Sequence, residues 1–114
     1  MGLHFSLSFD IDTGTKIINY EVYEIHITHN LAAIARQSNT YNILWKPYEN
    51  AYIYAKDIIP QLKRGLKYII DNESQLQKLN PENGWGSYDL YIDKIKSIIK
   101  ACNEYPNALI EADI

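Results

Sequence analysis

The stretch "HFSLSFDIDTGTKIINYEVYEIHIT", residues 4–28, decides the fold because it alternates apolar and polar residues on both sides of a short turn. Residues 4–11 carry phenylalanine, leucine or isoleucine at every second position, which is the period of a half-buried strand. Asp12 and Gly14 are typical of a tight turn, and residues 16–28 are again rich in strand-forming side chains. The stretch therefore predicts an antiparallel hairpin.

Three segments after the hairpin carry apolar residues at helical spacing. Asn30 is a suitable N-cap for a short helix with the sequence "LAAIARQ". Pro47 fits the first turn of a longer helix. Because the apolar phase of that helix continues across Pro60, we expect one kinked helix rather than two helices joined by a loop. A third helix, long and amphipathic, follows Ser87 and ends at Pro106.

The last segment, residues 108–114, alternates in the same way as the hairpin and needs a sheet to join. The hairpin is the only sheet that the sequence offers. We therefore expect an α+β fold, in which the hairpin and the C-terminal strand form a three-stranded antiparallel sheet and three to four helices pack on one face. The 114 residues are enough for one hydrophobic core and too few for two, so residues 1–114 form a single domain.

Composition and charge exclude several classes of function. The formal net charge of −3 argues against a protein that binds extended nucleic acid through a basic surface. The single cysteine, Cys102, leaves no internal disulfide and is expected to be a core thiol. The first ten residues, "MGLHFSLSFD", lack the basic and apolar regions of a signal peptide, and no apolar run has the roughly 18 residues of a membrane span. A cytoplasmic protein is expected.

The stretch "NPENGWGSY", residues 80–88, combines a turn with an unexplained tryptophan. Asn83 and Gly84 form the pair typical of turns with positive φ, and Ser87 is a natural N-cap for the helix that follows. A turn does not require Trp85, so its ring either covers the core or contacts a ligand or partner. Gly86 would leave room for another group to approach the backbone.

The predicted binding residues lie mainly where the three helices begin. His29 and Asn30 stand between a strand and a helix, where free backbone N–H groups favour anions. If the three helix entrances share one end of the sheet, aromatic and amide groups converge there in a pocket that suits a nucleotide or another small anion. The alternative is that the same residues cap helices and fill the core. The expected set is His29, Asn30, Tyr41, Trp45, Asn83, Trp85, Gly86, Ser87 and Tyr88.

Metal binding and catalysis find less support in the sequence. His26 and His29 form an HxxH pair, but residues three apart on a strand point to opposite faces. His4 could join one of them, yet no cysteine or carboxylate spacing completes a ligand set. We therefore expect no metal and no cofactor. The one plausible general base is His29, so a small enzyme acting on a nucleotide-like substrate is the alternative function.

Four segments resemble a family of small uncharacterised proteins found in phages and prophages of low-GC bacteria. They are "ITHNL" (27–31), "YNILWKP" (41–47), "NPENGWGSY" (80–88) and "ACNEYP" (101–106). The resemblance extends from the second strand onward. It implies an intracellular accessory protein of the anti-defence type, a non-enzymatic binder that inhibits or sequesters a host factor. That factor would be a host protein or a nucleotide signal.

The chain is also expected to associate with itself. A three-stranded sheet has two edges, and ten tyrosines are more than a small core can hide. We predict a homodimer, formed through a sheet edge or through the tyrosine-bearing face of residues 48–54.

Overall fold

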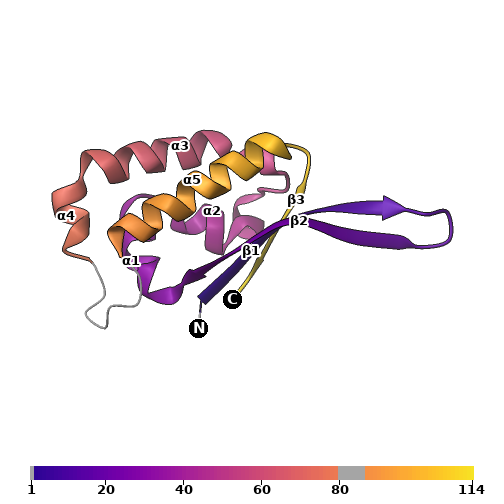
Figure 1. Cartoon of the computed structure of the whole chain (residues 1–114), viewed down its shortest axis with the longest axis horizontal. Helices are drawn as coiled ribbons and strands as arrows, with labels where there is room; N and C mark the ends of the chain where they lie inside the picture. The colour runs from indigo at the N-terminus through magenta and orange to yellow at the C-terminus, as the bar shows by residue number, and fades with distance from the viewer. Residues whose placement is uncertain (1, 80–86) are drawn as a thin grey trace.

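The computed structural model describes residues 2–79 and 87–114, which form a three-stranded sheet with helices on one face (Figure 1). This confirms the predicted α+β class. The elements in chain order are β1 (Gly2–Asp12), β2 (Ile17–Thr28), the 3₁₀ helix η1 (His29–Leu31), α1 (Ala32–Gln37), α2 (Tyr41–Trp45), the 3₁₀ helix η2 (Pro47–Asn50), α3 (Ala55–Asp71), α4 (Glu73–Gln77), α5 (Tyr88–Glu104) and β3 (Leu109–Asp113).

The sheet has the order β2-β1-β3, and both pairs of neighbours are antiparallel. The predicted hairpin and the C-terminal strand beside it are therefore confirmed. At the hairpin turn, Gly14 has a φ of 91° and its N–H donates to the Asp12 carboxylate over 2.8 Å. The turn that the sequence predicts is thus formed by Asp12, whose side chain accepts the hydrogen bond, and by Gly14, which tolerates a positive φ.

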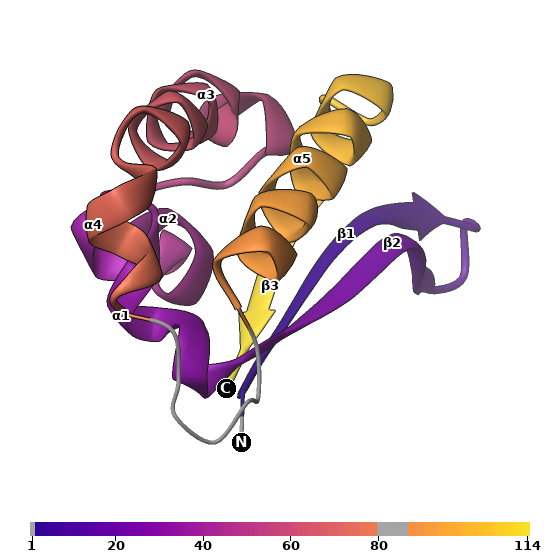
Figure 2. The same ribbon diagram turned by 60° about the vertical axis from the view of Figure 1, so that its left-hand side comes forward.

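The core lies between the sheet and the helices, as Figure 2 shows from the side. Every second residue of β1 from Leu3 to Leu7 is buried against the helices. Helices α3 and α5 lie side by side, α5 and α2 contact the sheet, and Ile58, Leu62, Ile95 and Ile98 are fully buried. These residues recur at helical spacing, so the amphipathic pattern in the sequence found the correct buried faces.

The third helix of the structure begins later than the sequence predicts. Pro47 opens the short 3₁₀ helix η2 instead of the long helix, and Ala51 then turns the chain with a φ of 60°. Tyr54 forms an isolated β-bridge with Leu109, so the chain is extended alongside β3 just before α3 starts at Ala55. From there α3 continues through Pro60 as one helix and not as two, and the kink at Pro60 stays a prediction.

The distal half of the hairpin extends beyond the helical layer (Figure 1). Strand β3 pairs with β1 from His4 to Ser8, and beyond Ser8 the described partner of β1 is β2. We call residues 9–21 the arm. A register shift in β2 opposite Leu7 and Ser8, at Val22, marks the place where the arm leaves the body. The arm accounts for much of the longest dimension of the molecule, 53 Å against 27 and 23 Å.

None of the helices in residues 2–79 and 87–114 combines the length and the apolar character that a membrane crossing requires.

Candidate functional site

The three histidines of the chain line one hollow at the end of the sheet where the termini lie. The hollow has a volume of about 600 Å³ and is formed by the ends of all three strands together with η1. His4 comes from β1, His26 from β2 and His29 from η1. Asn30 and Asp113 are also part of its wall. The structure thus gathers side chains that are far apart in the sequence.

Two of the histidines contact each other across the β1–β2 pair. His4 and His26 are register partners, and their ring centroids are 4.4 Å apart in an edge-to-face arrangement. The next pair on the same face is Ser6 with Glu24, which places the Glu24 carboxylate diagonally across from His4. The distance from His4 Nε2 to Glu24 Oε2 is 3.4 Å. Strand register alone therefore brings an imidazole pair and a carboxylate together.

Further carboxylates surround this cluster. Glu21 lies close enough to Glu24 that a hydrogen bond between the two carboxyl groups is the main cause that raises the pKa of Glu21. On the other side of β1, Asp113 is the register partner of His4, and Glu111 is the partner of Ser6. Four acidic side chains thus lie around the two histidines, so this face favours a cation over an anion.

Asn30 does not occupy the N-cap position that the sequence predicts. The chain leaves β2 directly into η1, and η1 runs on into α1 without an extended residue between them. The residue before α1 is Leu31, with helical φ and ψ. A continuous 3₁₀-to-α connection replaces the side-chain cap, so His29 and Asn30 belong to the wall of the hollow rather than to a capped helix entrance.

Tyr41 lines a second, smaller hollow of about 280 Å³ with Arg36 and Lys46. The Arg36 guanidinium carbon lies 4.4 Å from the centroid of the Tyr41 ring, a cation–π contact. Tyr41 also stacks on Trp45, with centroids 5.1 Å apart and an interplanar angle of 13°. Two cations and two amide side chains, Asn39 and Asn42, line this hollow, which suits an anion.

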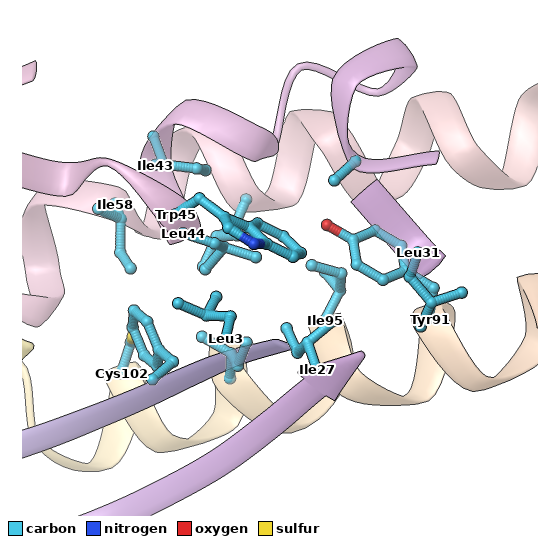
Figure 3. Packing of buried hydrophobic residues seen from close by; sticks show 14 of the residues in the cluster. Leu3, Ile27, Leu31, Ile43, Leu44, Trp45, Ile58, Tyr91, Ile95 and Cys102 are labelled. Carbon is cyan, nitrogen blue, oxygen red and sulfur yellow. The ribbon is translucent and has the colours of Figure 1, made fainter. Parts of the chain in front are cut away.

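Trp45 itself lies in the core between the helices and the sheet, only 3% exposed (Figure 3). Its indole N–H has no hydrogen-bond acceptor among the described residues. The ring therefore fills the core, which was the alternative to a role of this tryptophan in the pocket. Its one described ring contact is the stack with Tyr41.

Ser87 and Tyr88 hold the start of α5. The Ser87 hydroxyl accepts a hydrogen bond of 3.2 Å from the Leu90 N–H, so the predicted N-cap is confirmed. Tyr88 is buried, and its hydroxyl donates to the Ile69 carbonyl over 2.6 Å. Burial is the first cause that raises the pKa of this phenol. The contact joins the start of α5 to α3, which is a structural role.

The described members of the predicted pocket do not share one site. His29 and Asn30 line the histidine hollow, Tyr41 lines the cationic hollow, and Trp45 and Tyr88 are buried. Asn83, Trp85 and Gly86, with the binding-loop prediction made for them, lie outside the described residues.

Sequence reasoning missed the residues that complete each of the two hollows. Glu24 was overlooked although it stands two positions before His26, the spacing that puts both on one face of a strand. Its closeness to His4 depends on the register and had no local signal. Arg36 and Lys46 flank Tyr41 at a distance of five residues on each side, a spacing that no helical or strand period brings together.

In comparisons with known proteins, the chain matches no family model, no curated protein and no solved structure.

Proposed function

We propose that this chain is a non-enzymatic binding protein that contacts a partner protein through its arm, residues 9–21. The observation that carries the proposal is an apolar sheet face that continues past the helices. Ile11 and Ile18 are register partners, and Tyr20 pairs with Phe9 on the same face. Ile11, Ile18 and Tyr20 are 48%, 43% and 60% exposed.

The position of α5 explains why this face is open. Phe9, the innermost residue of the arm, is half-buried and meets Tyr105 with ring centroids 6.4 Å apart. Helix α5 has ended at Glu104, so the helical layer stops there while the strands continue (Figure 1). An exposed apolar surface on a protruding strand pair is a typical protein-binding feature.

The charges on the arm indicate what kind of partner fits. Asp10, Asp12 and Glu21 are acidic, and Lys16 is the single basic residue of the segment. The partner surface that complements the arm is an apolar groove bordered by basic side chains. In the setting implied by the phage-type resemblance, the partner is a host protein in the bacterial cytoplasm, and occupying its groove inhibits or sequesters it.

A small anionic ligand is the second candidate, and it is favoured by the cationic hollow of Arg36, Tyr41 and Lys46. Arg36 and Trp45 both contact the Tyr41 ring, so the positive charges of Arg36 and Lys46 would bind the anion. The histidine hollow is a poorer place for a nucleotide, because Glu24 and Asp113 beside it repel phosphate groups. This also weakens the alternative of an enzyme that uses His29 on a nucleotide-like substrate.

The test of the arm proposal compares two matched double variants. Ile18→Ser/Tyr20→Ser changes the arm, and Tyr68→Ser/Ile70→Ser removes the same two residue types from exposed positions on α3. The wild-type chain is used to capture a partner from the cells that naturally make it, and the partner is then purified. Dissociation constants are measured by titration calorimetry for the wild type and for both variants.

We expect the arm variant to bind at least roughly tenfold more weakly and the α3 variant to bind like the wild type. Circular dichroism melts verify that both variants fold. Equal affinity of the arm variant and the wild type would refute the proposal. Capture of nothing but a second copy of the chain would replace it with self-association, and loss of binding in an Arg36→Ala variant alone would favour the anion site.

A further inference from the structure

The outer face of the sheet carries a cluster of potential metal ligands that is separate from the arm. One ligand atom from each of His4, Glu24 and His26 lies within 4.8 Å of the other two. The cluster lies in the part of β1 and β2 on the body side of the bulge and contains no residue of the arm, so it does not depend on the function proposed above. We propose that these three residues bind a divalent transition-metal ion, with Zn²⁺ as the best-matched ion.

The backbone holds the three residues in place. His4 belongs to the central strand of the sheet, with β2 on one side and β3 on the other, and its side chain is 33% exposed. On β2, His26 pairs with His4 and Glu24 pairs with Ser6, both in the regular stretch of pairing between Gly2 and Leu7. Because the strands already hold the backbone, only the three side chains have to rotate when a metal ion binds. The entropic cost of binding is therefore small.

The distances suit a tetrahedral ion. Zinc takes imidazole nitrogen and carboxylate oxygen at about 2.0–2.2 Å, which puts neighbouring ligand atoms about 3.3–3.5 Å apart. The His4 Nε2 to Glu24 Oε2 distance is already 3.4 Å. The His26 ring, which meets His4 edge to face, closes the remaining gap by a small rotation. Three protein ligands leave a fourth position for water or for a group from a partner.

The surrounding charge favours a cation at this place. Glu21 is the register partner of Ser8, so it lies on the same face of the sheet as His4 and Glu24. Glu111 and Asp113 approach from β3. An ion pair between His4 and Glu24 accounts for one contact of the cluster and the strand register for the other, whereas a single metal ion would use all three side chains at once.

The test is a calorimetric titration of the chain, without a histidine tag, with ZnCl₂ in a non-chelating buffer. Glu24→Gln keeps the shape of the side chain and removes its charge, and His26→Ala removes the second imidazole. His29→Ala is the matched control, because His29 lines the same hollow but is not among the three clustered residues. Absorption of the Co²⁺ form in the visible range gives a second readout of tetrahedral coordination.

We expect one zinc ion per chain with a micromolar dissociation constant, roughly tenfold or more weaker binding in Glu24→Gln and His26→Ala, and no change in His29→Ala. Zinc should also raise the melting temperature of the wild type and of His29→Ala, but not of Glu24→Gln. Millimolar binding of the wild type, or an equal loss in His29→Ala, would overturn the site. Because Glu24 is exposed, its substitution leaves the fold intact and keeps the test decisive.

Discussion

At the scale of single residues, buried hydroxyl groups join helices to one another. Tyr91 is fully buried on α5, and its hydroxyl lies 2.6 Å from the Thr40 hydroxyl, just before α2. Thr40 in turn meets Ser38, whose hydroxyl donates to the Ile34 carbonyl over 2.9 Å. Cys102 is fully buried among apolar side chains, so the expected core thiol is confirmed.

Because the buried thiol and phenol groups are weak acids, the free energy of unfolding depends on pH in the alkaline range. Burial raises the pKa of the Cys102 thiol to about 12 from an ordinary value of 9.0, and it also raises the pKa of the Tyr91 and Tyr88 phenols. Above pH 9 the unfolded chain loses these protons while the folded chain retains them. The folded state is therefore fully stabilised below pH 9 and loses stability progressively as the pH rises toward 12.

We expect the free energy of unfolding to fall by about 1–2 kcal/mol between pH 8 and pH 10. Urea titrations followed by circular dichroism at several pH values measure the slope. Cys102→Ala lowers stability at every pH by leaving a small cavity, but its pH dependence above 9 should be shallower than that of the wild type. A stability that stays constant from pH 8 to pH 11 would contradict the burial of these groups.

Among the elements, α3 shows how tertiary contacts place a helix boundary. The first N–H groups of α3 donate to residues after α5: Ala55 to the Ala108 carbonyl and Lys56 to the Pro106 carbonyl, both over 2.9 Å. The Asp57 carboxylate accepts from the Tyr54 N–H over 3.0 Å and closes the first turn. The helix begins where these acceptors are available, because unpaired first-turn N–H groups are costly.

Pro60 is the weak point of the same helix. It lies inside α3 on an exposed position, where it has no N–H to donate to the Lys56 carbonyl one turn earlier. We expect Pro60→Ala to raise the free energy of unfolding by roughly 1–3 kcal/mol, measured as a higher urea midpoint. Lys63→Ala, at another exposed position of α3, should change stability by less than about 0.5 kcal/mol. An unchanged or lower midpoint for Pro60→Ala would mean that the proline is required by its surroundings.

At the scale of the whole molecule, the two edges of the sheet differ, because other parts of the chain bond to the β3 edge and no strand covers the β2 edge among the described residues. At the β3 edge, the Ile110 N–H donates to the Ile53 carbonyl over 2.9 Å, and the Ala112 N–H donates to the Tyr48 hydroxyl over 3.2 Å. Tyr48 is thus engaged within the chain although its ring is exposed. The β2 edge has no neighbouring strand among the described residues, so it is the edge that remains available for association.

The homodimer therefore stays a prediction, and the structure narrows where it would form. We expect light scattering at micromolar concentration to give twice the chain mass of 13.2 kDa, with contact through the β2 edge. A Tyr48→Phe variant, which changes only the β3 side, should dimerise like the wild type. A monomer mass at every concentration would refute the dimer, and loss of the dimer in Tyr48→Phe would move the interface to the face of residues 48–54.

Local chemistry in the sequence determined most of the fold. The period-two alternation of the hairpin, the Asp12–Gly14 turn, the Ser87 cap and the C-terminal strand all act over a few residues, and each is found where the sequence placed it. The fold class followed, because a lone C-terminal strand has to pair with an existing sheet.

Tertiary structure alone decided the start of α3 and the composition of the candidate sites. The sequence placed the helix at Pro47, but acceptors on the segment after α5 place it at Ala55. The sequence also grouped His29 with Tyr41, whereas the structure separates them and brings Glu24 to His4. Periodicity in the sequence determines which face of a strand or helix a side chain occupies. Only strand register and tertiary packing determine which residues of other elements lie opposite that face, and a binding site is made of such residues.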